Sequence, residues 1–278
     1  MAKTYREVLK WASSFLESQD KEGHAIFYLF LHRKNWQMTD WLLHMNEVIT
    51  SQAENQIKTD IDLLLTDMPP QYLLGYEEFF GRRFKVTHDT LIPRPETEEL
   101  VDLCLKQNIS RNENKRVVDV GTGTGAIAVT LKLERPIWQV LATDISEKAL
   151  IQAQVNAQNL RADVAFFQGD TLEPIKDPID ILISNPPYIS EEEWPLMDAS
   201  VRKYEPKEAL FAKNNGYAIY QKLARQAQKK LAINGQIFLE IGFQQGPKVQ
   251  EIFQQAFPRK EVQVLKDLAG QNRMVFVH

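Results

Sequence analysis

From Lys115 to the end of the chain, short runs rich in β-branched and aromatic residues alternate with stretches of helical periodicity. The runs expected to form strands read RVVDVG, QVLATD, VAFFQGD, IDILISN, GQIFLEIG, VQVLKD and RMVFVH. Helices are expected between most of them, beginning near Ala126, Ser146, Asn215 and Pro247. This alternation predicts an α/β fold, a doubly wound and mostly parallel sheet with helices on both faces. Only LAGQN separates the last two strands, which is too short for a crossover helix, so we expect an antiparallel C-terminal hairpin at one edge.

The chain before this alternating region has a different character. Residues 1–75 show apolar positions at helical spacing and no strand pattern, with Thr4, Thr39 and Ser51 as candidate N-caps, so we expect a small all-α bundle. The stretch FFGRRFKV, turning back through THDT, predicts a linking β-hairpin over 76–94. The α/β domain is then expected over 95–278.

Composition excludes several classes of protein. The 278 residues are 44% hydrophobic and 25% charged, and no apolar run reaches the roughly 18 residues of a membrane span. The first residues lack the apolar core of a signal peptide, which indicates a cytoplasmic protein. A net charge of -4 does not favour general nucleic-acid binding. The single cysteine, Cys104, is expected to be an inert core thiol, and the histidines show no metal-ligand spacing, so no metal site is predicted.

A glycine-rich turn follows the first strand of the α/β domain. In VVDVGTGTGA, Gly121, Gly123 and Gly125 lie between that strand and a helix, where glycine lets the backbone turn tightly and approach a ligand. Asp144 ends the next strand, where a carboxylate can accept both hydroxyls of an adenosine ribose. The stretch also fits the G-x-G-x-x-G/A pattern, so the glycines alone leave a nicotinamide dinucleotide as an alternative.

The order of the acidic residues distinguishes these alternatives. Asp119 precedes the first glycine, Asp144 ends the second strand, Asp170 follows the third, and a polar loop follows the fourth. This order, with the reversed last strand, resembles the class I S-adenosylmethionine methyltransferases. The resemblance implies that Asp119 lies near the methionine end, that Asp144 binds ribose, and that Asp170 and Thr171 border adenine. The cofactor-binding set that it implies is Asp119, Gly121, Thr122, Gly123, Thr124, Gly125, Asp144, Asp170, Thr171 and Asn185.

The stretch ILISNPPY carries the candidate chemistry. Prolines cannot continue a ladder of backbone hydrogen bonds, so the strand is expected to stop at Asn185 and enter a stiff loop. A planar nitrogen is a poor nucleophile because its lone pair is delocalised. The side-chain oxygen of Asn185 and the carbonyl of Pro186 can accept its two N–H groups, which raises the electron density on the nitrogen. Pro187 keeps the loop rigid, and Tyr188 offers a flat face to the planar target.

Methyltransferases acting on adenine or cytosine amino groups and on glutamine amides share this motif. Six stretches narrow the choice: YLLGYEEFFGRRFKV, LIPRPETEELVD, DVGTGTGAIA, SNPPYI, YEPKEALFA and DLAGQNRMV. Over essentially the whole chain they resemble the methyltransferase family that modifies a glutamine of peptide chain release factors. The resemblance implies S-adenosylmethionine as cofactor and the glutamine of a Gly-Gly-Gln loop on a class I release factor as substrate. Because any glutamine offers the same N–H pair, we expect the helical domain to recognise the protein substrate. We also expect a monomer that binds neither nucleic acid nor membrane.

Two stretches depart from the family pattern. The loop 211–217 lacks most of the glycines usual in the family and keeps Gly216, and Thr171 stands where an aromatic residue is common. Two other functions stay open at this point. One is a nicotinamide-dependent dehydrogenase of the same fold class, and the other is a noncatalytic partner-binding protein that retains a nucleoside pocket.

Overall fold

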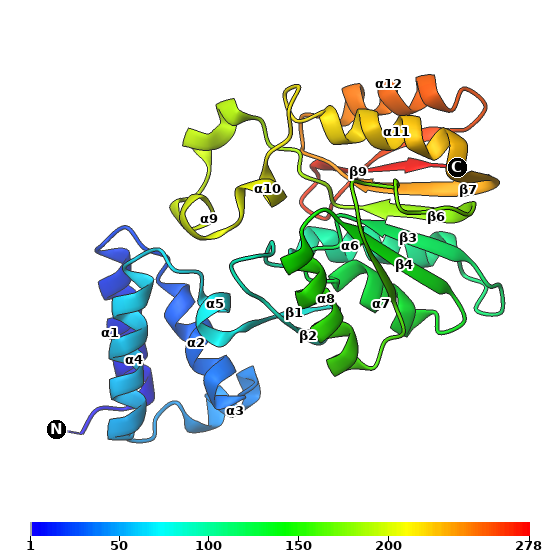
Figure 1. Cartoon of the computed structure of the whole chain (residues 1–278). Helices are drawn as coiled ribbons and strands as arrows, with labels where there is room; N and C mark the ends of the chain where they lie inside the picture. The colour runs from blue at the N-terminus through cyan, green and yellow to red at the C-terminus, as the bar shows by residue number, and fades with distance from the viewer. Residues whose placement is uncertain (1) are drawn as a thin grey trace. The chain divides into compact units, whose positions relative to one another are not determined.

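The computed structural model describes residues 2–278, which divide into two compact units (Figure 1). One unit contains the chain up to Tyr76 together with Asp198–Tyr204. The other contains Glu77–Met197 and Glu205–His278. The helical unit therefore takes in one segment that lies far along the sequence.

The helical unit is a bundle with its own apolar core, as its periodicity predicted. Its helices are α1 (Tyr5–Glu17), α2 (His24–Lys34), α3 (Met38–His44), α4 (Ser51–Leu64), α5 (Pro70–Leu74) and the distant α9 (Ala199–Tyr204). Ala12, Leu16, Ile26 and Leu29 are fully buried between them. At the end of α9, the Tyr204 hydroxyl donates to the carbonyl of Thr66 at 3.0 Å, which ties this helix to the rest of the bundle. No helix within residues 2–278 is long and apolar enough to cross a membrane.

The N-caps of three helices in the bundle differ in part from those predicted from the sequence. Thr4 caps α1 as expected, because its hydroxyl accepts from the backbone N–H of Glu7 at 3.2 Å. The other two predicted caps are wrong. Helix α3 begins at Met38, two residues before a helix capped by Thr39 would begin, and its N-cap is Gln37, whereas α4 is capped by Thr50. Ser51 is instead the first residue of α4, since the hydroxyl of the preceding threonine already accepts from Ala53 N.

The second unit is built on a seven-stranded sheet, and the predicted doubly wound architecture is confirmed. The strands are β3 (Arg116–Val120), β4 (Gln139–Asp144), β5 (Ala165–Gln168), β6 (Ile179–Ser184), β7 (Leu231–Glu240), β8 (Val262–Lys266) and β9 (Asn272–Val277). Their order is β5-β4-β3-β6-β7-β9-β8. Strand β9 is antiparallel to both neighbours and the remaining pairs are parallel, which is the expected C-terminal hairpin at one edge.

Helices cover both faces of this sheet (Figure 1). One face is covered by α6 (Pro95–Gln107), α7 (Ala126–Glu134) and α8 (Glu147–Leu160), and the other by α11 (Ala218–Lys230) and α12 (Gly246–Ala256). Trp138 and Phe238 are fully buried on the first side, and Tyr220 and Phe253 on the second. Two short elements, the 3-10 helix η1 (Glu191–Leu196) and α10 (Lys207–Leu210), lie in the long connection after β6.

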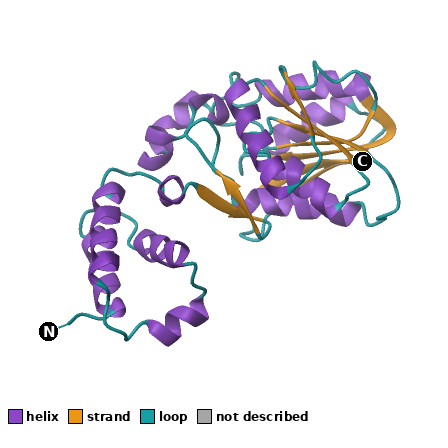
Figure 2. Ribbon diagram, turned by 60° about the horizontal axis from the view of Figure 1, so that its bottom comes forward, coloured by secondary structure: helices purple, strands orange, loops and turns teal. Residues whose placement is uncertain are grey.

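A two-stranded hairpin, β1 (Tyr76–Phe79) and β2 (Arg82–Lys85), is separate from the main sheet (Figure 2). The predicted turn through THDT is wrong. The chain reverses at Phe80 and Gly81, whose φ angles of 52° and 70° suit a two-residue turn of the kind that matches strand twist. The hairpin is therefore shorter than expected, and the segment 87–90 forms a separate turn in which Thr90 N donates to Thr87 O at 3.2 Å.

Candidate active site

The predicted site residues follow strands whose carboxyl ends meet at one edge of the sheet. Strand β3 lies between β4 and β6, and Val120 is in register with Thr143 on one side and Ser184 on the other. In the next pair, Ser184 of β6 is in register with Leu239 of β7. The glycine-rich turn, Asp144 and Asn185 therefore leave the sheet at neighbouring points, where open α/β sheets bind their ligands.

The glycine-rich turn is held to β4 and keeps one side open. The N–H groups of Gly121 and Thr122 donate to the carbonyl of Thr143 at 2.9 and 3.0 Å. A β-carbon on Gly125, whose φ is 81°, would lie 3.1 Å from the β-carbon of Ala153, so close helix packing requires this glycine. A β-carbon on Gly121 or Gly123 would meet no heavy atom within 4 Å. The backbone at these two positions is thus accessible to a ligand.

Asp119 is a fully buried acid with one unpaired oxygen. Its Oδ2 accepts from the Thr122 hydroxyl at 2.6 Å and from the Ala128 N–H at 3.2 Å. Its Oδ1 has no hydrogen-bond partner anywhere in the described chain. Burial raises the pKa of this carboxyl to about 7, and the two hydrogen bonds oppose the rise. A ligand group that carries a positive charge or an N–H would supply what Oδ1 lacks.

Asp144 is positioned by the turn that it faces. Its Oδ2 accepts from the Gly123 N–H and its Oδ1 from the Ser146 N–H, both at 2.9 Å. Burial raises its pKa, and these backbone hydrogen bonds oppose that effect. Each carboxylate oxygen has two lone pairs, so each retains one acceptor position. Two adjacent acceptors in fixed orientation fit the paired hydroxyls of a ribose.

Three further predicted residues have partners within the protein. Thr124 is buried, and its carbonyl accepts from Asn156 Nδ2 at 2.9 Å. Asp170 forms an ion pair of 2.5 Å with Lys222. Thr171 has a left-handed φ of 59°, and its hydroxyl lies 2.7 Å from Gln226 Oε1. The placement of Asp170 and Thr171 beside adenine stays a prediction.

Asn185 leaves β6 with its amide already oriented. Its Nδ2 donates to the hydroxyl of Thr97, in the first turn of α6, at 3.0 Å. The preceding Ser184 hydroxyl donates to the carbonyl of Val120 at 2.6 Å, which fixes the end of β6 against β3. Pro186 is buried, so the turn after Asn185 is enclosed as well as stiff. With its NH2 group engaged, the amide of Asn185 has its oxygen left for a substrate.

Two parts of the chain support the loop after Asn185: Gln245, and the loop 211–217, which departs from the family pattern. Gln245 Nε2 donates to the carbonyl of Tyr188 at 2.8 Å. Ile189 N donates to Leu210 O at 2.9 Å and its carbonyl accepts from Ala212 N at 3.0 Å, which forms a parallel bridge. Burial raises the pKa of the Tyr188 hydroxyl far above neutrality, so its ring is uncharged. The loop 211–217 therefore supports the Asn-Pro-Pro-Tyr turn through backbone contacts.

Known proteins share both the sequence and the fold of this chain. A release factor glutamine methyltransferase from Enterococcus faecalis is 59% identical over 275 residues, which cover 99% of each chain. The chain belongs to the release factor glutamine methyltransferase family. A relative of the same name from Lactococcus lactis is 47% identical over 89% of this chain and 90% of its own. Membership of this family decides against the nicotinamide-dependent and noncatalytic alternatives.

Two domain models agree with this assignment to the release factor glutamine methyltransferases, and a solved structure shares the fold. Residues 7–75 match the PrmC N-terminal domain and residues 101–202 match the Methyltransferase small domain. A crystal structure of a methyltransferase from Pyrococcus furiosus aligns with a TM-score of 0.53 at 15% identity, over 79% of this chain and 97% of that one. At this identity the likeness shows the methyltransferase fold alone.

Four residues that support the site in this glutamine methyltransferase family member were not predicted from the sequence. Thr97 and Glu240 lie behind Asn185, Gln245 holds the Tyr188 carbonyl, and Glu205 is a buried carboxylate paired with Arg94. For Glu240 the signal in the sequence is positional, because Glu240 ends the fifth strand of the sheet as Asp144 ends the second. Thr97 and Glu205 lie within LIPRPETEELVD and YEPKEALFA, two of the stretches that carry the family resemblance, but no individual role was assigned to them.

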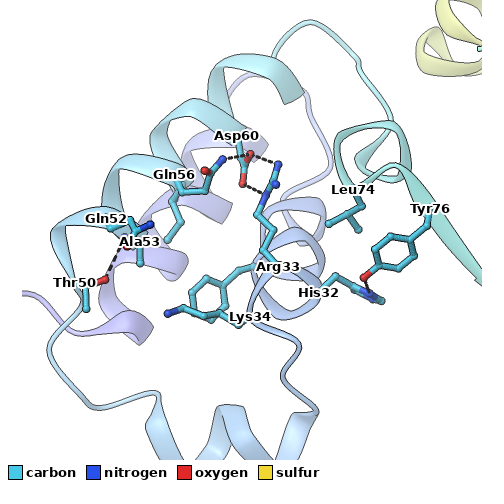
Figure 3. A pocket seen from close by; sticks show the side chains of 12 residues that line it. His32, Arg33, Lys34, Thr50, Gln52, Ala53, Gln56, Asp60, Leu74 and Tyr76 are labelled. Carbon is cyan, nitrogen blue, oxygen red and sulfur yellow. Dashed lines mark hydrogen bonds and ion pairs between the residues drawn. The ribbon is translucent and has the colours of Figure 1, made fainter. Parts of the chain in front are cut away.

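A hollow of about 480 Å³ lies in the helical unit (Figure 3). On its wall the guanidinium of Arg33 donates to both carboxylate oxygens of Asp60, at 2.9 and 3.0 Å. Gln56 Nε2 donates to the same carboxylate at 3.0 Å. Asp60 is almost completely buried, so these contacts join α2 to α4 and neutralise a buried charge. We interpret this cluster as a structural tie within the bundle.

Proposed function

We propose that this chain transfers a methyl group from S-adenosylmethionine to the side-chain amide nitrogen of the glutamine in the Gly-Gly-Gln motif of class I peptide chain release factors. The observation that carries the proposal is the orientation of Asn185 at the carboxyl end of β6. Its NH2 group is held by Thr97, so its oxygen is free to accept an N–H from a substrate amide. Membership of the family and the adjacent glycine-rich turn support the same activity.

The residues around the turn fit the cofactor. When bound, S-adenosylmethionine supplies an electrophilic methyl group on its sulfonium. Gly121 and Gly123 leave the backbone open to it, and Asp144 retains two acceptor positions suited to the ribose. The unpaired oxygen of Asp119 suits the charged methionine end. Thr122 and Thr124 hold the turn in shape, and Asp170 with Thr171 closes the proposed adenine end.

The Asn-Pro-Pro-Tyr turn activates and orients the substrate. Asn185 Oδ1 and the carbonyl of Pro186 each accept one N–H of the glutamine amide, which draws its nitrogen into line and raises its electron density. Pro186 and Pro187 keep these acceptors in position before the substrate arrives. Tyr188 offers its uncharged ring to the planar amide. A strong base is unnecessary, because the nitrogen becomes acidic once it carries the methyl group.

We assign recognition of the release factor to the helical unit. Every glutamine offers the same pair of N–H groups, so Asn185 and Pro186 alone cannot distinguish one protein from another. The overall negative charge opposes a nucleic-acid substrate. The enzyme is proposed to act as a cytoplasmic monomer on its protein partner, without binding a membrane.

A methyl-transfer assay tests the activity. Tritiated S-adenosylmethionine is offered with an intact class I release factor, with its Gln→Ala variant at the Gly-Gly-Gln motif, and with duplex DNA. We expect label only in the unaltered factor. Label in DNA, or undiminished label in the variant, would contradict the proposal. Calorimetric titration with S-adenosylhomocysteine and with NAD checks the cofactor separately, and tight binding of NAD alone would overturn the cofactor assignment.

A further inference from the structure

Three side chains from distant parts of the sequence form a continuous hydrogen-bonded chain behind the site. Asn185 Nδ2 donates to Thr97 Oγ1 at 3.0 Å, and Thr97 Oγ1 donates to Glu240 Oε2 at 2.6 Å. Thr97 is 5% exposed and Glu240 2% exposed, so water does not compete for these contacts. Thr97 lies in the first turn of α6, Asn185 directly follows β6, and Glu240 is the last residue of β7.

The chemistry of Glu240 determines the direction of every hydrogen bond in this chain. An ionised carboxylate only accepts hydrogen bonds, and a threonine hydroxyl has a single proton. The short contact to Glu240 therefore takes the proton of Thr97, as expected for a charge-assisted hydrogen bond. The remaining lone pairs of Thr97 can then only accept, so the amide of Asn185 must present its NH2 group to this hydroxyl. Its oxygen consequently points away from Thr97.

We propose that Thr97 and Glu240 are positioning residues that determine which end of the Asn185 amide faces the substrate glutamine. The inference rests on the proposed function, in which the Asn185 oxygen accepts a substrate N–H. An asparagine side chain is nearly symmetric in shape, and turning it over would present donors to a substrate that also offers donors. The hydrogen bonds from Asn185 to Thr97 and from Thr97 to Glu240 prevent this reversal. Thr97 and Glu240 therefore act through Asn185 and do not contact the reacting nitrogen themselves.

The burial and charged surroundings of Glu240 make the orientation of the Asn185 amide sensitive to pH. The charged and titratable side chains that act on this carboxyl are Arg273 from β9, Arg94 and Glu96 from the start of α6, Tyr188 from the proline loop and Tyr220 from α11. Burial is the largest influence and raises the pKa of Glu240 to about 7, whereas the Thr97 hydrogen bond and Arg273 oppose the rise. A protonated Glu240 can donate to Thr97, which frees the threonine proton to donate to the oxygen of a reversed Asn185 amide. Turnover is therefore expected to decline as the pH falls through about 7.

Removal of the Thr97 hydroxyl tests the proposal on the full-length enzyme. Thr97→Val keeps the shape of the side chain but loses both hydrogen bonds, and we expect kcat to fall about 10-fold or more with the affinity for S-adenosylhomocysteine nearly unchanged. Thr97→Ser restores the hydroxyl and should recover most of the activity. Thr130→Val is the matched control, because Thr130 is also fully buried in a helix but its hydroxyl has no partner in the described chain.

Glu240→Gln supplies a readout that a merely structural role would not change. A glutamine neither ionises nor imposes one direction on Thr97, so we expect a lower kcat and loss of the decline below about pH 7. The proposal is overturned if Thr97→Val keeps full kcat while Asn185→Ala loses it, or if Glu240→Gln keeps the wild-type pH profile. Full activity of Asn185→Ala would instead reject the proposed role of Asn185 itself. Thermal unfolding of each variant identifies any loss of activity that comes from misfolding.

Discussion

A β-carbon built on Gly216 would lie 2.1 Å from the carbonyl oxygen of Tyr188. The same glycine has a φ of 85°, a conformation that side-chain-bearing residues rarely adopt. Gly216 is thus required both by its backbone angle and by its contact with the Asn-Pro-Pro-Tyr turn. The loop 211–217 departs from the family pattern at most of its glycines, and the one that it keeps is the one that touches the Asn-Pro-Pro-Tyr turn.

Gly216→Ala is expected to displace the loop around Tyr188 and lower kcat by about 10-fold or more, because near-attack geometry tolerates little movement. Cofactor affinity should change little, since the glycine-rich turn is on another strand. Gly270→Ala is the matched control: its φ is 80°, but a β-carbon there would meet no atom within 4 Å. Both variants carry similar backbone strain, so equal losses of kcat would argue that the contact with Tyr188 is irrelevant.

Substitution of Asp144 by alanine is expected to weaken cofactor binding, whereas substitution of Asn185 by alanine is expected to lower kcat. Asp144→Ala removes acceptors that bind the cofactor equally in ground and transition states, so the dissociation constant of S-adenosylhomocysteine should rise about 10-fold or more. Asn185→Ala removes an acceptor that strengthens during attack, and kcat should fall about 10²-fold or more by analogy with oxyanion-hole donors. Calorimetry and steady-state kinetics separate the two effects. Equal losses of cofactor affinity would contradict this division of roles.

The raised pKa values of the buried acids Glu240 and Asp119 lead to a predicted dependence of the free energy of unfolding on pH. The pKa of Glu240 is raised from 4.5 to about 7 in the folded chain, so the folded state binds a proton more tightly than the unfolded state. The stability that this group contributes is complete below its unfolded pKa and is lost as the pH rises through about 7. Asp119, raised from 3.8 to about 7, acts in the same direction.

Denaturant unfolding measures this effect. The free energy of unfolding should fall between about pH 5 and pH 8, with a contribution from Glu240 on the order of 3 kcal/mol. Glu240→Gln should flatten this dependence, and Asp119→Asn should do so independently. A wild-type free energy that rises over this interval, or slopes unchanged in both variants, would show that the two acids are ionised throughout.

The helical unit is expected to matter for the protein substrate and little for the cofactor. A chain without residues 1–75 should keep its affinity for S-adenosylhomocysteine, because the glycine-rich turn and Asp144 belong to the other unit. Methylation of an intact release factor should fall far more than that of a short Gly-Gly-Gln peptide. The segment Asp198–Tyr204 groups with the removed helices, so cofactor binding also serves as the control for folding. Equal losses of methylation activity toward the intact factor and the peptide would show that the helical unit does not recognise the release factor.

The helices and strands of the α/β unit and their order could be predicted from the sequence. Alternating apolar runs and helical periodicity specify local structure, and a doubly wound sheet is the arrangement that buries such strands on both faces. The short link LAGQN required the antiparallel end of the sheet. The glycine-rich turn, Asp144 and Asn185 could be named as candidate site residues because each lies at or directly after the carboxyl end of a strand, and the carboxyl ends of parallel strands meet at one edge.

Turns and caps were less predictable, because neighbouring positions offer similar chemistry. Thr50 and Ser51 can both cap a helix, and the contact with Ala53 N selects Thr50. The hairpin turn was expected in a polar stretch but forms at Phe80 and Gly81. There, burial of Phe79 and Phe84 on either side determines the strand pairing.

The residues that support the proposed catalytic side chains could be identified only from the packing of distant segments. Thr97 is 88 residues from Asn185 and 143 from Glu240, so no local pattern links them. Their contact depends on α6 packing against the sheet and on β6 lying beside β7, which bury Thr97 and Glu240. Burial also raises the pKa of Glu240, whereas the same glutamate in an extended chain would be ionised and solvated. Local sequence specifies which groups can react, and packing between distant segments decides how those groups are oriented and charged.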